Sequence, residues 1–95
     1  MPQLDPLIHA PARLQVVTTL SAVSEAEFAT LRDALEVSDS VLSKHIATLA
    51  DAGYVRSRKG VRVGRRTTWI GLTSAGREAL REHVAALRRL IDVVD

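Results

Sequence analysis

The stretch of residues 37–55 constrains the fold more than any other part of the sequence. Its polar and apolar residues follow a helical period over residues 39–52. Ser38 stands at the N-cap, where a hydroxyl accepts a hydrogen bond from a free backbone N–H. Gly53 follows the last turn, where a left-handed residue without a Cβ ends a helix with little strain. We therefore expect a capped helix over this range, followed directly by a turn.

The two faces of this helix differ in character. At about 100° per residue, Leu42, Ile46 and Leu49 form one apolar stripe that is expected to be buried. The opposite face is small and polar, and it carries Ser40, Ser43, Lys44, Ala47, Thr48 and Asp51. A solvated helix more often presents long charged side chains, so this face suits close approach to another polar surface, such as a DNA major groove. A plain surface helix is the alternative interpretation.

Length and composition exclude several classes of protein. A chain of 95 residues with 46% hydrophobic content is the size of one folded domain. It contains no cysteine, which excludes a disulfide framework and a thiolate zinc site. No apolar run approaches the roughly 20 residues of a membrane span. The first residues do not resemble a signal peptide, so we expect a cytoplasmic protein with no membrane partner.

The net charge of +2 hides an uneven distribution. Residues 1–53 carry three basic and seven acidic side chains, whereas residues 54–66 carry six basic side chains and no acidic one. Residues 67–95 carry four of each sign. The positive charge is therefore concentrated in one short segment.

Two segments precede the capped helix. Residues 11–21 open with a proline and place Leu14, Val16, Val17 and Leu20 at helical spacing, which predicts a first helix. Leu7 and Ile8 lie outside that stripe, and we interpret them as part of an interface rather than a satellite of the core.

A second helix is expected over residues 28–36, where Phe28, Leu31 and Leu35 recur at helical spacing. Ser24 and Glu27 have the spacing of a capping box at its start. Alternatively, Glu27 and Phe28 form a short extended pair that adds to a sheet, and the helix begins one residue later. In either case a tight turn leads into the helix over 39–52, which is the arrangement of a helix-turn-helix.

After Gly53 the period changes to that of a β-hairpin. Residues 54–59 and 67–72 are predicted to be strands, with a loop over 60–66 between them. Ile70 and Leu72 should face the core, which places Trp69 on the outer side. A charge run is usually a solvated surface. Here six cations without a local anion would repel one another unless an external polyanion neutralised them, which favours nucleic acid as the partner.

The last helix is expected over residues 74–94 with Thr73 and Ser74 capping it. Its apolar residues step by four and three, as in a heptad seam, at Leu80, Val84, Leu87, Ile91 and Val94. Further apolar residues broaden this face beyond what one packing partner needs, which indicates a homodimer, although a plain core helix is the alternative. The predicted dimer interface combines this helix with residues 1–10, including Leu7 and Ile8.

Three motifs resemble a winged-helix transcriptional regulator. They are Ser-x-Ser-x-x-Ser-Lys-His-Ile at 38–46, Leu-Ala-Asp-Ala-Gly-Tyr-Val at 49–55 and Ile-x-Leu-Thr-x-x-Gly-Arg at 70–77. With the basic segment between the last two, the pattern is similar to the MarR/ArsR-like group, above all to its short stand-alone members. The resemblance covers about residues 12–90. It implies one mainly α domain over residues 1–95 with a small β-hairpin, in which terminal helices pair two subunits.

The resemblance also implies a binding mode for double-stranded DNA. The helix over 39–52 would enter the major groove, with groove and phosphate contacts from Ser38, Ser40, Ser43, Lys44 and Thr48. The basic wing over 58–66 would lie on phosphates or in the minor groove, with contacts from Arg58, Lys59, Arg62, Arg65 and Arg66. Two such helices in a symmetric dimer meet major grooves about 34 Å apart, which predicts an inverted-repeat site. The metal-sensing cysteine motif of the ArsR group is absent, so no metal or other cofactor is expected.

His45 lies at the edge of the apolar stripe and has three interpretations. The favoured one is a half-buried histidine hydrogen-bonded within the domain; the others are a phosphate contact, and a metal ligand or pH switch. Ser43 and His45 are two residues apart and point to different sides of a helix, so they form no nucleophile–base pair. With no catalytic constellation elsewhere, we do not expect an enzyme.

Two functions remain as alternatives to a DNA-binding regulator. One is a winged helix that serves protein–protein interaction, which has little reason to leave six cations unopposed. The other is a ligand-responsive regulator, in which a small apolar effector sits between the domain and the dimer helices.

Overall fold

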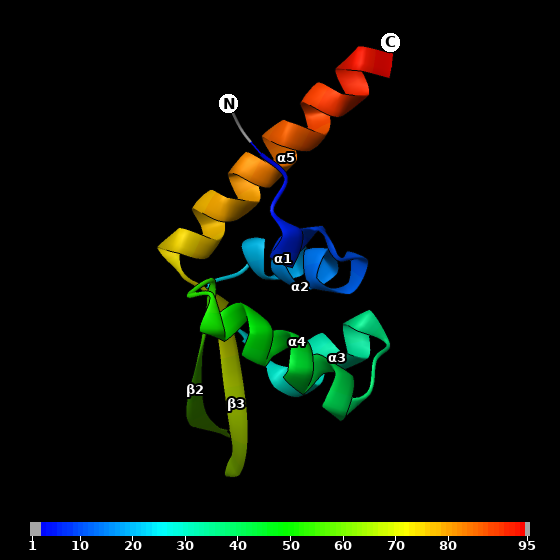
Figure 1. The fold of residues 1–95 in the computed structure, drawn as a ribbon. Helices are drawn as coiled ribbons and strands as arrows, with labels where there is room; N and C mark the ends of the chain where they lie inside the picture. The colour runs from blue at the N-terminus through cyan, green and yellow to red at the C-terminus, as the bar shows by residue number, and fades with distance from the viewer. Residues whose placement is uncertain (1–2, 95) are drawn as a thin grey trace.

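A computed structural model describes residues 3–94 and shows a mostly helical chain with one small antiparallel sheet. In chain order the elements are α1 (Pro6–His9), α2 (Pro11–Ser21), β1 (Ala26–Glu27), α3 (Phe28–Leu35), α4 (Asp39–Asp51), β2 (Val55–Arg62), β3 (Arg65–Leu72) and α5 (Ser74–Val94). Helices α3 and α4 lie beside the hairpin, α1 and α2 lie between α4 and α5, and α5 projects away from the body (Figure 1). The molecule is consequently elongated, at 52 × 25 × 21 Å.

Helices and sheet share one aliphatic core. Its buried members are Ile8, Val16, Val17, Leu20, Leu31, Leu42, Ile46, Leu49, Val55, Ile70 and Leu72. The stripe expected on the third helix is therefore confirmed, and α4 ends one residue before the expected boundary. No helix in the described part of the chain is long and apolar enough to cross a membrane.

The sheet has the strand order β1-β3-β2. Its third strand confirms that an extended pair precedes α3, although the pair is Ala26–Glu27, one residue earlier than expected. The expected capping box does not form, because Glu27 is itself the N-cap residue and makes no side-chain cap bond. Its carboxylate reaches the hairpin instead. Glu27 therefore takes part in the pairing of β1 with β3 and does not cap α3 with its side chain.

The hairpin is longer and its turn tighter than the sequence suggested. The loop expected over 60–66 is wrong, because the strands pair as far as Arg62 and Arg65. Only Val63 and Gly64 connect them, with φ angles of 50° and 75°. Positive φ at both central residues is the geometry of a type I′ turn, whose twist matches that of the flanking strands. This match allows the ladder to continue to the tip.

The N-terminal segment corrects one expectation. Ile8 is fully buried in the core of its own chain and has no surface left for a partner, so its assignment to a dimer interface is wrong. The physical reason is α1, which packs against α2 and α5 and turns this side chain inward. Leu7 is half-buried. Residues 1–2 of the expected interface segment lie outside the described residues.

Helix α5 is seated directly on the end of α4. The Thr73 hydroxyl accepts a hydrogen bond from the Gly76 N–H at 3.0 Å and donates one to the Gly53 carbonyl at 2.6 Å. Gly76 touches the backbone of Tyr54, where a Cβ would lie only 2.9 Å from the carbonyl carbon. The root of α5 is thereby fixed to the turn between α4 and β2.

The expected heptad seam of α5 divides into two parts. Leu80 packs against the core, and Val84 and Leu87 are half-buried. Ile91 and Val94 are 62% and 85% exposed, on the part of the helix that projects from the body. Leu80 therefore belongs to the fold of this chain, Val84 and Leu87 are partly covered, and the end of the seam is open.

Candidate nucleic-acid interface

The turn between α3 and α4 sets the orientation of α4. Glu36 ends α3 in the left-handed region with φ of 55°, which reverses the chain direction. Ser38 then caps α4 as expected, since its hydroxyl accepts a hydrogen bond from the Val41 N–H at 3.2 Å. Across the turn, the Arg32 guanidinium donates to the Asp39 carboxylate at 2.7 Å. This ion pair joins α3 to the first turn of α4.

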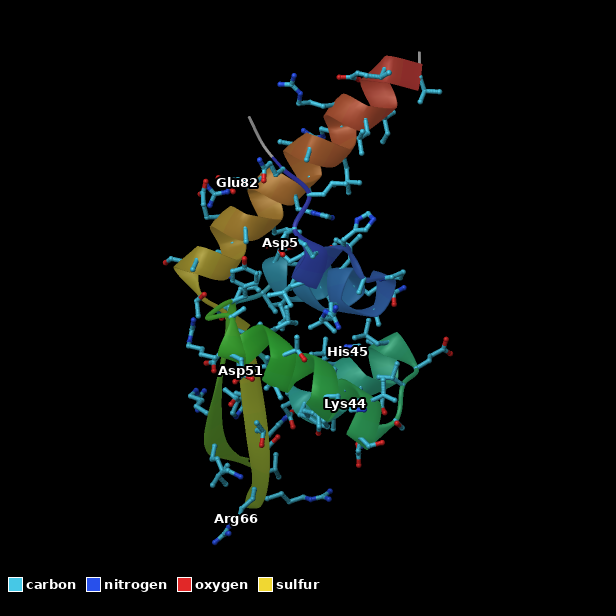
Figure 2. The ribbon with its side chains drawn as sticks, viewed as in Figure 1. Asp5, Lys44, His45, Asp51, Arg66 and Glu82 are labelled. Atoms are coloured by element: carbon cyan, nitrogen blue, oxygen red, sulfur yellow. The ribbon has the colours of Figure 1, made fainter. Side chains whose placement is uncertain are left out.

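The polar face of α4 is open. Ser38, Ser40, Ser43 and Lys44 are all exposed, and Figure 2 shows Lys44 on the outer side of the helix. Thr48 differs from them, because it is half-buried and its hydroxyl donates to the Lys44 carbonyl at 3.0 Å. Its oxygen can still accept a hydrogen bond, but its proton is already engaged.

A groove connects α4 to the hairpin. Small residues of α4 and hydroxyl residues of the sheet line it, together with apolar side chains. The lining residues are Phe28, Ser43, Ile46, Ala47, Ala50, Ser57, Thr68 and Ile70. The polar face of α4 and the hairpin therefore form one continuous surface.

The pairing register divides the hairpin into two faces, since side chains alternate along a strand. The inner face, which continues from the core beneath α4, carries the pairs Ser57–Ile70, Lys59–Thr68 and Val61–Arg66. The outer face carries the pairs Arg56–Gly71, Arg58–Trp69, Gly60–Thr67 and Arg62–Arg65. Trp69 is on the outer face, as expected. The wing cations are thus split between two sides.

The expectation that these cations lack a local anion is wrong for two of them. Arg58 pairs with Glu25 at 2.8 Å, and Arg62 pairs with Glu27. The acids come from the segment around β1, which the sheet brings beside β3 from more than thirty residues earlier in the chain. Because the acids and the arginines are far apart in the sequence, their pairing could not be predicted from local patterns.

Three wing cations have no such partner. Within residues 3–94, no carboxylate lies within ion-pair distance of Lys59, Arg65 or Arg66. Figure 2 shows Arg66 at the free end of the hairpin, extending beyond it. The open positive charge of the wing is therefore concentrated at its far end.

His45 is half-buried, as expected. Burial lowers its pKa, and the positive charges of Arg13 and Lys44 lower it further. The described part of the chain provides no hydrogen bond to its ring, which leaves the expected internal partner unsupported. Nor do the described residues contain a cluster of three or more potential metal ligands.

Sequence reasoning missed a polar network around His83. This residue is fully buried on α5, and its Nδ1 accepts a hydrogen bond from the Asp5 N–H at 3.0 Å. The Tyr54 hydroxyl donates to the Asp5 carboxylate at 2.6 Å, and this bond, with burial, raises the pKa of Tyr54 to about 12. His9 lies edge-on to His83 at 5.4 Å. The only sequence signal was the place of His83 on the apolar side of α5, between Leu80 and Leu87.

Comparison with known proteins agrees with this geometry. A family model described as a winged helix DNA-binding domain matches residues 12–91 of the chain. The chain belongs to this winged-helix family. A relative from Methanocaldococcus jannaschii, the uncharacterized protein MJ0432, is 27% identical over 84 residues, which cover 88% of this chain and 91% of the relative.

Solved structures place this winged-helix domain among transcriptional regulators. A transcriptional regulator homologue from Pyrococcus horikoshii OT3 has a TM-score of 0.88 and 27% identity, and the match covers 94% of this chain and 88% of that one. AbsC, a MarR family transcriptional regulator from Streptomyces coelicolor, has a TM-score of 0.67 and 29% identity. That match covers 83% of this chain and 57% of AbsC. The expected winged-helix, MarR-like assignment is confirmed.

Proposed function

We propose that this winged-helix domain, residues 1–95, is a homodimeric transcriptional regulator that binds double-stranded DNA sequence-specifically. Helix α4 enters the major groove, and the wing formed by β2 and β3 lies along phosphates or in the adjacent minor groove. Base and phosphate contacts on α4 come from Ser38, Ser40, Ser43, Lys44 and Thr48. The wing contributes Lys59, Arg65 and Arg66.

The observation that carries this proposal is the continuity of an exposed surface from the polar face of α4 to the wing. The hydroxyl and lysine side chains of α4 point outward rather than into the core, and the groove beside them leads to the hairpin. Small side chains allow the helix backbone to approach base edges closely, while Lys44 has the reach for guanine O6 and N7. The unpaired cations at the wing tip complement phosphate charge.

The second subunit is proposed to pack on the projecting end of α5. Four large apolar side chains are exposed there, and a contact with a second subunit would bury them. They are Leu90, Ile91, Val93 and Val94. Val84, Leu87 and the half-buried Leu7 extend this surface toward the body, while Leu80 is mainly used by the core. An isologous contact through this helix would relate the two α4 helices by a two-fold axis.

Selection of bound sequences from a random duplex pool, repeated at two salt concentrations, tests the proposal. An enriched inverted repeat is the expected result, because a symmetric dimer places two recognition helices on successive turns of the duplex. Sedimentation of the free protein measures the dimer independently. Weak binding at low salt with no enriched sequence would contradict the proposal and favour the protein–protein interaction alternative.

A further inference from the structure

Two acidic side chains in the winged helix are held against the cations of the wing. The Glu25 carboxylate accepts from Arg58 Nε at 2.8 and 3.1 Å. The Glu27 carboxylate accepts from the Arg62 guanidinium and, at 2.9 Å, from the Thr67 hydroxyl. Each contact joins the segment around β1 to the hairpin, on the hairpin's outer face.

The acids are the fixed members of these pairs. The side chains of Glu25 and Glu27 are only 23% and 13% exposed, whereas Arg58 and Arg62 are 58% and 61% exposed. Backbone pairing of Glu27 with Trp69 anchors its position in the sheet. The hydrogen bond from Arg62, followed by that from Thr67, lowers the pKa of Glu27, which keeps it charged near neutral pH. Both carboxylates are thus held in place by the fold.

The Arg58 side chain packs against Trp69 and Gly60. Its guanidinium lies 5.5 Å from the centre of the Trp69 ring, at cation–π distance. Gly60 leaves the space for this arrangement, because a Cβ there would come within 3.0 Å of both the Arg58 guanidinium and the Trp69 ring. The side chain is consequently folded back along the outer face toward Glu25.

The inner face of the hairpin differs. Lys59 and Arg66 occupy it, on the side that continues from α4, and among the described residues neither has an acidic partner. The outer face therefore carries three of the wing cations, Arg58, Arg62 and Arg65, of which the first two are paired with carboxylates. The two cations of the inner face are open.

We propose that Glu25 and Glu27 are specificity-determining residues that act as internal counter-ions and withhold Arg58 and Arg62 from DNA. This inference rests on the proposed function. A phosphate that contacted Arg58 or Arg62 would first have to displace a carboxylate that cannot follow the arginine into solvent. The wing then binds phosphate through Lys59 and Arg66, with Arg65 at the tip, and its sequence-independent affinity stays low. Discrimination between sites is left to α4.

The number of phosphates that the protein neutralises can be measured directly. The logarithm of the binding constant falls with the logarithm of the salt concentration, with a slope of about 0.9 per neutralised phosphate. Removing two cations that contact phosphate should therefore reduce the slope by about 1.8 per subunit, whereas removing two that are held by carboxylates should leave it nearly unchanged.

The first experiment compares two matched double variants, Arg58→Gln with Arg62→Gln, and Lys59→Gln with Arg66→Gln. Binding of a mixed-sequence 30-base-pair duplex (about three turns) is followed by fluorescence anisotropy across a salt series. We expect the salt slope of the Lys59/Arg66 variant to be smaller by about 1.8 per subunit and that of the Arg58/Arg62 variant to equal the wild-type slope. Equal losses for the two variants would overturn the inference while leaving DNA binding intact. A wild type that fails to bind at low salt would overturn the proposed function itself.

The second experiment releases the arginines by replacing Glu25 and Glu27 with glutamine. We expect a steeper slope, by up to about 1.8 per subunit, and tighter binding to the mixed-sequence duplex at low salt. The matched control replaces Glu82 with glutamine and Asp92 with asparagine, two exposed acids of α5, and makes the same change in net charge. An equally steep salt slope in the control variant would overturn the inference. Weaker DNA binding by a Glu25/Glu27 variant that retains its helical circular dichroism would overturn it too, because the two acids would then serve to position the wing. If this variant does not fold, the comparison of the Arg58/Arg62 and Lys59/Arg66 double variants decides the question.

Discussion

Replacing Gly76 with alanine should destabilise the winged helix, although a glycine-to-alanine change usually stabilises a helix. Alanine is favoured over glycine in a helix interior by about 1 kcal/mol. Here, however, the new Cβ would lie 2.9 Å from the Tyr54 carbonyl carbon and 3.1 Å from its Cα, and closer still to the carbonyl oxygen. Carbon atoms at van der Waals contact lie about 3.5–4.0 Å apart, so α5 would have to move by several tenths of an ångström or more.

Overpacking of this kind typically costs about 1–3 kcal/mol, which outweighs the gain in helix propensity. At about 2 kcal/mol, the midpoint of thermal unfolding should fall by roughly 8–16 °C in a domain of this size. Thermal denaturation followed by circular dichroism, at one fixed protein concentration, measures the shift.

Ala75→Gly, at the neighbouring exposed position, is the matched control for Gly76→Ala. It should lower stability by no more than about 1 kcal/mol, through helix propensity alone. A Gly76→Ala variant as stable as the wild type, or more stable, would refute the reasoning, because the contact with the Tyr54 backbone would then not be close in solution.

Three further outcomes are expected. Lys44→Ala should weaken binding to the selected site by about 1–3 kcal/mol if Lys44 contacts a base, whereas equal losses on selected and mixed duplexes would identify a phosphate contact. Val63→Asn should raise the unfolding midpoint, since asparagine tolerates the left-handed φ of 50° better than a β-branched residue; a lower midpoint would contradict this assignment of strain. The free energy of unfolding should fall as the pH drops below about 6.5, because burial lowers the pKa of His45 and His83, so the folded state stays neutral while the unfolded state takes up protons. His83→Asn should make this dependence shallower in urea titrations; an unchanged slope would exclude His83 as its source.

The sequence was informative wherever local periodicity decides the structure. The apolar stripe of α4, the Ser38 cap and the inward direction of Ile70 and Leu72 all follow from spacing of a few residues. The α5 boundaries, Ser74–Val94, follow from the same kind of pattern.

The remaining features depend on contacts between distant segments. The partners Glu25 and Glu27 of the wing arginines lie 33 and 35 residues away from them along the chain. The assignment of Ile8 failed for the same reason, since nothing near it in the sequence indicated that α1 folds back on α2 and α5. Likewise, the backbone N–H that hydrogen-bonds to the buried His83 belongs to Asp5, which is 78 residues earlier.

The two-residue turn at Val63 and Gly64 limits how the hairpin can change in length. Because neighbouring residues of a strand point to opposite sides, one residue inserted into β2 would exchange everything beyond it between the two sides. Lys59 would then lie on the outer face, which holds Glu25 and Glu27, and an arginine would move to the inner face, away from these carboxylates. We expect natural relatives that keep this division of charge to lengthen or shorten their hairpins by two residues per strand at a time.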